Sequence, residues 1–360
     1  MTVEGEKMAT SSCTISFFRN DLESTDGNKC PVKNCTVKVQ NYLVPFKRYK
    51  GQMKYKPFCP EHGIRIHKNT FVYYNGPDLA TATKRNLMFN ADYYVANIFN
   101  KPGKVESHRL CYETSEDAVT YNVFTELLAN GQAIKQLVGH ITGQEVGENV
   151  ELYLWGGKID LKNNSFSPYE PLKKVHKELE QGIGIPTEPD IMLIVPSKII
   201  ICIEAKFGSK NPLAKEKEEK IGEKPKSWKK LKERYCDKND IIDGGREIFD
   251  FNNSPTLFYE QLFRNLVFAA SMAKLGGIEE WYVANLRSEH IMNLKRGEPE
   301  SKPVVRSIQK ILKPEYKKNF VHLTWEELYE KCVKSDMSLA NLSWYLKNKS
   351  FECRRAFNIF

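Results

Sequence analysis

Three side chains in the middle of the chain have the types and spacing of a metal-binding catalytic centre. Asp190 follows a proline, and thirteen residues separate it from Glu204. Lys206 lies two residues farther on. Residues i and i+2 of a β-strand point to the same face, so Glu204 and Lys206 should lie side by side. Converging carboxylates form the oxygen-rich kind of site that Mg²⁺ or Mn²⁺ prefers. The pattern therefore predicts a divalent cation held by Asp190 and Glu204.

Two predicted strands would bring these carboxylates together. The segments DIMLIV and KIIICIEAKF are short and rich in Ile, Val and Leu, and a turn is expected between them at Pro196 and Ser197. If the strands pair antiparallel, Asp190 falls opposite residue 203 or 204, where cross-strand neighbours lie about 5 Å apart. A Glu and a Lys at the end of such an apolar strand would be costly to bury without partners or a metal. A solvated strand end would explain a bare Glu-x-Lys, but the preceding hairpin favours a catalytic role.

The order of these residues resembles that of the PD-(D/E)XK nuclease superfamily, whose members have a restriction-endonuclease-like core. Pro189 and Asp190 precede a hydrophobic strand that ends in Glu204, Ala205 and Lys206. The resemblance covers about residues 110–295. It implies an α/β fold with a mixed central β-sheet flanked by helices, hydrolysis of phosphodiester bonds, and a catalytic Mg²⁺ or Mn²⁺ bound by the Asp and the Glu. It also implies that Lys206 orients or activates the attacking water and stabilises developing charge.

Many members of this superfamily add a glutamate from the first core helix, and Glu116 is the preferred match here. Ser115 is an N-cap residue type followed by two acids, so a helix should begin near it. Glu116 could instead only complement the helix dipole, and Glu126 is then the substitute candidate. Gln261 and Arg264 lie three residues apart on one face of a later predicted helix, as do Gln/Arg residues in some of these enzymes. A solvated helix face explains that pair as well.

The first part of the chain holds a second group of metal-ligating residue types. Four residues separate Cys30 from Cys35, and two separate Cys59 from His62. Two close pairs of such ligands are what tetrahedral Zn²⁺ uses in structural sites. A segment with so little helical periodicity needs a staple, which favours a structural zinc over four unrelated residues. Basic residues and tyrosines lie between the pairs and would suit a nucleic-acid contact or a solvated loop equally; they are Lys47, Arg48, Lys50, Lys54, Lys56, Tyr42, Tyr49 and Tyr55.

The order of the predicted elements divides the chain into four parts. We expect a zinc-binding module over 1–75, a connecting segment over 76–109, a PD-(D/E)XK nuclease-like core over 110–295 and a helical C-terminal segment over 296–360. Within the last part, Thr324 and Glu327 have the spacing of a capping box. A helix followed by strands, then a helix and a strand, is typical of an α/β core.

Composition narrows the class of protein. The 360 residues are 28% charged and 41% hydrophobic, as in a globular protein, and no apolar run is long enough to span a membrane. We therefore expect a cytoplasmic protein without a membrane partner. Lys and Arg exceed Asp and Glu by nine, and six of these net charges lie between Lys206 and Lys238, where twelve basic residues face six acidic ones. Such a stretch could contact a polyanion or form a solvated loop.

These observations together predict a metal-dependent DNA endonuclease related to restriction or genome defence, acting on double-stranded DNA, with a homodimer left open. One alternative is a catalytically inactive nucleic-acid-binding or scaffolding protein of the same fold. Another is a nuclease that acts on RNA or single strands. The chain contains no Walker loop, Gly-rich dinucleotide turn, G-x-S-x-G or H-E-x-x-H, so the chemistries that depend on these motifs are not indicated.

Overall fold

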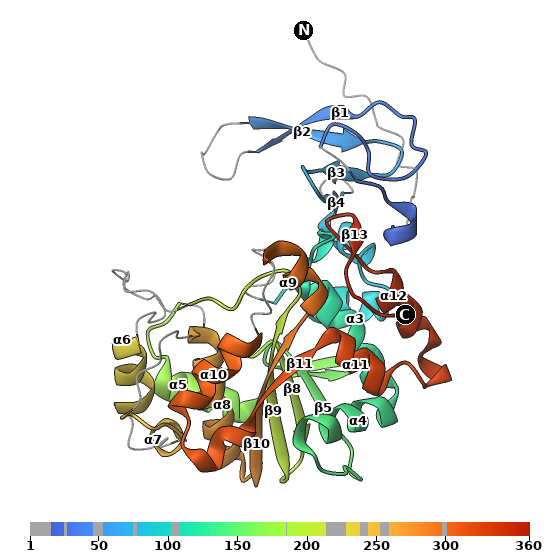
Figure 1. The fold of residues 1–360 in the computed structure, drawn as a ribbon. Coiled ribbons are helices and arrows are strands. Elements are labelled where there is room, and N and C mark those ends of the chain that lie inside the picture. The colour runs from blue at the N-terminus through green and yellow to red at the C-terminus, as the bar shows by residue number, and fades with distance from the viewer. Residues whose placement is uncertain are drawn as a thin grey trace.

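A central β-sheet between two layers of helices forms the larger part of the molecule (Figure 1). The computed structural model describes residues 16–24, 27–45, 53–74, 78–101, 109–184, 186–213, 228–237, 244–252, 259–296 and 301–360. Within these residues the sheet has seven strands in the order β11-β10-β9-β8-β5-β6-β7. The predicted α/β class with a mixed sheet is therefore confirmed.

The sheet is antiparallel on one side and parallel on the other. Antiparallel pairs join β6 to β7, β5 to β6, β5 to β8 and β8 to β9, whereas β9, β10 and β11 run parallel. Short turns connect β5 to β6, β6 to β7 and β8 to β9, while connections that contain helices join the parallel strands. The strands are β5 (Glu151–Leu154), β6 (Gly157–Asp160), β7 (Ser165–Pro168), β8 (Ile191–Val195), β9 (Ile199–Lys206), β10 (Glu280–Arg287) and β11 (Phe320–Thr324).

Each face of the sheet has its own hydrophobic core. Alternate residues of β9 enter different cores: Ile201 and Ile203 pack with one helix layer, Ile200 and Cys202 with the other. The first layer contains α3 (Glu116–Ala129), α4 (Gly131–Thr142), α11 (Trp325–Cys332) and α12 (Ala340–Asn348). The second contains α5 (Glu170–Leu179), α8 (Glu260–Gly276) and α10 (Ser301–Ile311). Burial on both faces explains why β8 and residues 199–203 of β9 are apolar without interruption.

Two of the principal helices begin at the predicted residues. Ser115 is the N-cap of α3, and its side chain accepts a hydrogen bond from the backbone N–H of Ala118. Thr324 and Glu327 form the expected capping box at the start of α11. Gly277 ends α8 in the left-handed conformation, with φ of 62°, which a residue without a Cβ adopts at little steric cost. Local sequence therefore fixes where these helices lie along the chain.

The N-terminal part is more regular than its sequence indicates. Its four strands form an antiparallel sheet in the order β1-β2-β3-β4, where the sequence predicted a zinc-binding module but no strands. They are β1 (Gln40–Pro45), β2 (Met53–Cys59), β3 (Ile64–Ile66) and β4 (Phe71–Tyr73). Short strands with little alternation of polar and apolar residues give a weak sequence signal. This small sheet lies at one end of the molecule, next to the part that contains the central sheet (Figure 1).

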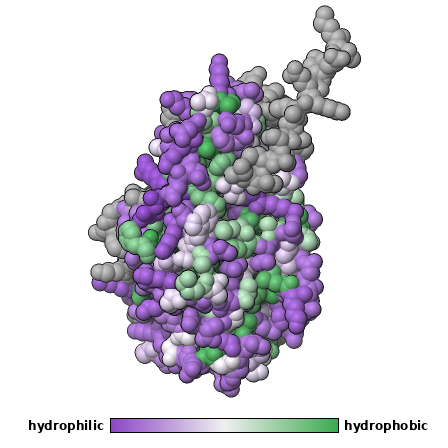
Figure 2. Space-filling model, turned by 90° about the vertical axis from the view of Figure 1, so that its right-hand side faces the viewer, coloured by the Kyte–Doolittle hydropathy of each residue, from purple (hydrophilic) through white to green (hydrophobic). Residues whose placement is uncertain are grey.

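The C-terminal part is not only helical. It supplies β11, an edge strand of the central sheet, and a short hairpin of β12 (Ser350–Phe351) and β13 (Arg354–Arg355). The face that carries α12 and the C-terminus is mainly hydrophilic, with smaller hydrophobic areas between (Figure 2). The remaining elements are short: α1 (Leu79–Lys84), α2 (Ala91–Asn97), α6 (Trp228–Lys232), α7 (Gly244–Ile248), α9 (Glu289–Arg296), the 3-10 helices at Arg19–Asp21, Arg109–Cys111, Pro314–Asn319 and Met337–Leu339, and a π-helix at Glu233–Asp237.

Candidate active centre and metal site

The β8–β9 hairpin places Asp190 beside the end of β9. The strands pair antiparallel, and Ile191 lies opposite Ile203, so Asp190 reaches the level of Glu204. The Asp190 Oδ2 atom accepts a hydrogen bond of 3.0 Å from the backbone N–H of Ala205. The structure thus brings Asp190 and the Glu204 segment together in the pairing that the turn at Pro196 predicts.

Glu204 and Lys206 share the face of β9 that looks toward α8. Their side chains are only 4% and 7% exposed, and Lys206 Nζ donates to Glu204 Oε1 at 2.6 Å. Burial by itself would lower the pKa of Lys206, but the neighbouring carboxylates, chiefly Glu204 and then Glu116, raise the pKa above its ordinary value. Lys206 is therefore a cation held among carboxylates.

Glu116 completes the group from the first turn of α3. Its Oε2 atom accepts hydrogen bonds from the backbone N–H of Phe207 at 2.7 Å and from Ser209 Oγ at 2.8 Å. Its Oε1 atom lies 3.7 Å from Lys206 Nζ. Glu126, the substitute candidate, lies ten residues farther along α3, about 15 Å along the helix axis. The structure therefore joins Glu116, and not Glu126, to the group.

The electrostatics of the group suit a cation. Burial and the nearby Glu204 carboxylate raise the pKa of Asp190 well above its ordinary value. Burial likewise raises the pKa of Glu116, while Lys206 opposes that rise. Three carboxylates meet one ammonium group here, so a negative charge is left that a divalent ion would compensate. Carboxylate oxygens are the donors that Mg²⁺ and Mn²⁺ prefer, and the residues present fit such an ion.

Asn265 also belongs to this centre, although no sequence motif singles it out. This residue of α8 is 1% exposed, and its Nδ2 atom donates to Glu204 Oε2 at 2.9 Å. Glu204 is thus held at both oxygens, one by Lys206 and one by Asn265. Asn265 lies four residues after Gln261 on the same helical face, so a search of that face for polar residues could have found it.

The other two predicted residues of α8 lie in its first two turns. Gln261 is partly exposed, whereas Arg264 is 5% exposed. The Nε and Nη1 atoms of Arg264 have no hydrogen-bond partner among the described residues. In the described contacts, Asn265 rather than Gln261 or Arg264 hydrogen-bonds to the acidic group.

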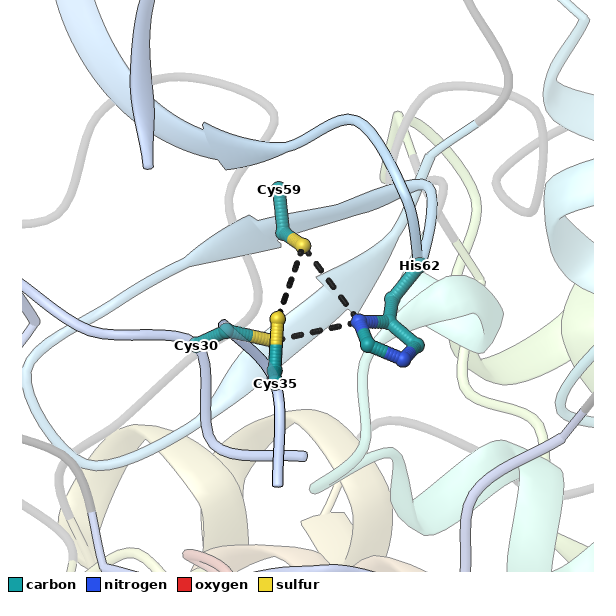
Figure 3. A group of neighbouring side chains, drawn as sticks. All are labelled: Cys30, Cys35, Cys59 and His62. Carbon is teal, nitrogen blue, oxygen red and sulfur yellow. Dashed lines mark hydrogen bonds between the residues drawn. The ribbon is translucent and has the colours of Figure 1, made fainter. Parts of the chain in front are cut away.

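The two cysteine and histidine pairs meet in the N-terminal module (Figure 3). The ligand atoms of Cys30, Cys35, Cys59 and His62 all lie within 4.8 Å of one another. His62 Nδ1 is 3.5 Å from Cys30 Sγ and 3.4 Å from Cys59 Sγ, and Cys35 Sγ is 3.8 Å from Cys59 Sγ. Three sulfurs and one imidazole nitrogen at these separations could hold a tetrahedral Zn²⁺.

The surroundings of Cys59 favour the thiolate form that binds metals. A hydrogen bond from Cys30 is the main reason why the pKa of Cys59 falls to about 5. Cys59 ends β2 and His62 follows in the turn to β3, where Gly63 adopts a φ of 55°. Strand pairing thus presents one pair of ligands, while the segment that holds Cys30 and Cys35 brings the other.

Several residues that the sequence singled out lie outside the described residues. These are Lys47, Arg48, Tyr49 and Lys50 between the ligand pairs, and Lys224 and Lys226 in the basic stretch. Lys229 and Lys230 of the same stretch are described, and both are exposed on the short helix α6. Among the described residues, no helix is both long and apolar enough to cross a membrane.

Comparison with known proteins identifies a family whose model covers most of the chain. Residues 41–349 match a family model described as restriction endonuclease associating with ARP. Comparisons with curated proteins and with solved structures gave no significant match. The matched range includes the acidic group at the end of β9, Glu116 on α3, and the second ligand pair of the N-terminal module. The chain therefore belongs to the family of restriction endonucleases associating with ARP.

Proposed function

We propose that the chain is a divalent-metal-dependent endonuclease that hydrolyses phosphodiester bonds of double-stranded DNA. The observation that carries the proposal is the meeting of Asp190, Glu204, Glu116 and Lys206 at the C-terminal end of β9. A solvated strand end would leave Glu204 and Lys206 exposed, whereas both are buried and paired. Membership of a restriction endonuclease family supports a nuclease role for this centre.

Asp190 and Glu204 would hold a Mg²⁺ or Mn²⁺ ion. When bound, such an ion polarises the phosphoryl group and lowers the pKa of a coordinated water. Asn265 keeps Glu204 in place through its Oε2 atom. The backbone N–H of Ala205 does the same for Asp190. Both carboxylates are therefore oriented by the chain itself, and this reduces the reorganisation needed when the ion binds.

Lys206 would act as a cation in this reaction. The carboxylates raise its pKa, so the side chain stays protonated at neutral pH. A protonated lysine can donate a hydrogen bond to the scissile phosphate and stabilise the charge that develops there. Glu116 faces Lys206 through one oxygen only, since its other oxygen is held by Phe207 and Ser209. Glu116 would thus position the Lys206 ammonium group for its hydrogen bond to the phosphate.

Incubation of the purified protein with supercoiled plasmid tests the proposal directly. We expect nicked or linear DNA with Mg²⁺ or Mn²⁺ and intact plasmid when EDTA is added. Single-stranded DNA and RNA in parallel reactions distinguish the substrate class. Cleavage that persists in EDTA, or its absence with either metal on all three substrates, would refute a metal-dependent nuclease.

Replacement of Lys206 by Met should reduce turnover more than metal binding. Methionine retains an unbranched side chain one atom shorter than lysine and removes the charge, so the lost interaction is with the phosphate and the water. We expect turnover to fall by about 10²- to 10³-fold, as when one donor to a developing negative charge is removed. The Mn²⁺ affinity, measured by calorimetry, should stay the same or increase, because Asp190 and Glu204 remain. Unchanged turnover would contradict this role.

The basic stretch offers a separate test of nucleic-acid binding. Replacement of Lys224, Lys226, Lys229 and Lys230 by Gln should weaken DNA binding for all sequences without changing where the DNA is cut. Each lost phosphate contact should reduce the slope of log K against log salt by about 0.9 on duplex DNA. Binding titrations between low and moderate salt measure this slope. A slope equal to that of the parent would indicate a solvated surface segment instead.

Three wider properties are part of the same proposal. Since the family is described by its association with ARP, we propose that this chain also associates with such a partner. We further propose a cytoplasmic location and, because duplex DNA has two strands to cut, a homodimer on the DNA. Light scattering with and without a duplex oligonucleotide tests the homodimer.

A further inference from the structure

The C-terminal hairpin lies where the N-terminal module meets the nuclease-like core (Figure 1). Its two strands are joined by Glu352 and Cys353, which have positive φ values of 53° and 58°. Such a two-residue turn fixes the register of the hairpin, so its side chains have defined neighbours. Phe351 is 7% exposed and points into the core, while Cys353 is 6% exposed and packs with the N-terminal module.

Phe351 contacts the segment that directly follows Lys206. Its ring packs edge-to-face on Phe207, with ring centroids 5.1 Å apart. The ring also covers Gly208 so closely that a Cβ atom at this position would lie 2.1 Å from two ring carbons. Only a glycine leaves room for this approach. The hairpin therefore presses on the segment 207–209 from one side.

The same segment is also held by the candidate active centre. The backbone N–H of Phe207 and the hydroxyl of Ser209 both donate to Glu116 Oε2. These bonds leave Glu116 Oε1 facing Lys206 Nζ. A displacement of the segment 207–209 would thus move Glu116 relative to Lys206.

A buried glutamate ties the hairpin to the N-terminal module. Glu113 is 1% exposed, and its Oε1 atom accepts a 2.7 Å hydrogen bond from the backbone N–H of Cys353. Its Oε2 atom accepts from Thr70 Oγ1, in the turn before β4, at 2.6 Å. Lys349, just before the hairpin, donates to the Glu113 carbonyl at 2.9 Å. A continuous series of contacts therefore connects Thr70 of the module, the hairpin and Glu116.

We propose that Phe351 is a positioning residue of the nuclease centre and that the C-terminal hairpin couples this centre to the docking of the N-terminal module. The proposal rests on the nuclease function proposed above. Phe351 keeps the segment 207–209 against Glu116, and Glu113 keeps the hairpin against Thr70. Packed and hydrogen-bonded neighbours of this kind can transmit a displacement, but a coupling must be measured between the two ends.

A double-mutant cycle of Gly208→Ala and Phe351→Ala measures the contact itself. Each single variant should reduce turnover about 10- to 100-fold, because residues that orient functional groups have effects of this size. In the double variant the new methyl group no longer meets the ring, so its turnover should be close to that of Phe351→Ala. If the reduction in turnover of the double variant equals the product of the two single reductions, the two positions act independently and the proposal is overturned. Phe351→Leu retains an apolar side chain and should have a turnover between those of Phe351→Ala and the parent. It keeps the proposal testable if Phe351→Ala does not fold.

Hydrogen exchange at the Phe207 amide is a readout that needs neither metal nor activity. This amide donates a hydrogen bond to Glu116. In the metal-free protein its exchange should therefore be at least about tenfold faster in Phe351→Ala than in the parent under the same conditions. Thr70→Val removes the donor to Glu113 and should accelerate the same amide in the same direction, to a smaller extent. An unchanged rate in Thr70→Val would overturn the coupling to the module.

Leu342→Ala is the matched control, because it removes a buried side chain of α12 and lowers general stability. We expect it to leave turnover and Phe207 exchange near the parent values at a temperature where it is folded. Equal effects of Leu342→Ala and Phe351→Ala would assign both to general destabilisation and overturn the proposal. If the parent does not cleave nucleic acid, the proposed nuclease function fails, while the exchange rates still decide whether Phe351 positions the segment.

Discussion

Asp190→Ala and Glu204→Ala should each abolish Mg²⁺-dependent cleavage and leave the fold intact. Both carboxylates lie at strand ends and would be ligands of the same ion, so the loss of either leaves an incomplete set. We expect at least about a 10³-fold loss of turnover, about 4 kcal/mol in the barrier, because each factor of ten corresponds to about 1.4 kcal/mol. Plasmid cleavage at saturating Mg²⁺ measures the loss.

The isosteric variants Asp190→Asn and Glu204→Gln distinguish a functional site from a structural one. Burial and Glu204 raise the pKa of Asp190, which means that its ionised form is unfavourable in the metal-free protein. Asp190→Asn should therefore unfold at the same or a higher temperature while losing cleavage. Sites that sacrifice stability for function have this property. Glu204→Gln can still accept from Lys206, so its fold should also persist.

Glu126→Gln is a suitable control, since this acid lies on the same helix as Glu116 but about 15 Å from it along the axis. Its cleavage activity should equal that of the parent. Full activity of Asp190→Ala or Glu204→Ala would refute the assignment of the centre. A loss of activity accompanied by unfolding in every variant would show that these residues are structural.

Removal of the zinc ligands should unfold the N-terminal module. Elemental analysis should find one tightly bound zinc per chain, and Cys59→Ser or His62→Ala should reduce it to a small fraction. Structural Zn²⁺ in finger-like peptides contributes about 10–16 kcal/mol of binding free energy, which is also folding free energy. This is more than the total stability of many domains. A sheet of four strands, two of them only three residues long, is therefore expected to depend on the ion.

Thermal unfolding before and after chelation gives the magnitude of this effect. A strong chelator should abolish the transition of the module, and added Zn²⁺ should restore it. Cys332→Ala is a matched control because Cys332 is a buried thiol on α11, outside the ligand group. It should retain the full zinc content. A module that is free of metal and still folded would contradict the prediction.

The metal dependence of the two sites can be measured separately. The acidic centre lies at the C-terminal end of β9, an inner strand of the central sheet, while Cys59 and His62 of the zinc ligands belong to the N-terminal sheet and its turn. Chelation by EDTA can affect both, so plasmid cleavage should be restored first with Mg²⁺ alone and then with Zn²⁺ added. Recovery that needs both ions would agree with the coupling through Glu113 and Phe351.

The sequence by itself determined those parts of the site that depend on neighbours along the chain. The turn at Pro196 and Ser197 makes β8 and β9 an antiparallel pair, and the register of such a pair follows from the length of the turn. Asp190 and Glu204 therefore had to meet. Ser115 and Thr324 fixed helix starts for the same local reason. The two closely spaced pairs, Cys30 with Cys35 and Cys59 with His62, likewise identified the four residues whose ligand atoms lie together.

Only the tertiary structure decided which residues from distant segments join this framework. The choice of Glu116 over Glu126, and the contact of Asn265 with Glu204, depend on how α3 and α8 pack against the sheet. Packing of a helix is set by the shape of its whole buried face, which short motifs do not encode. For the same reason β11 joins the sheet from a segment that was expected to be helical, and Phe351 reaches Gly208 from the end of the chain, where long-range packing leaves no periodic signal in the sequence.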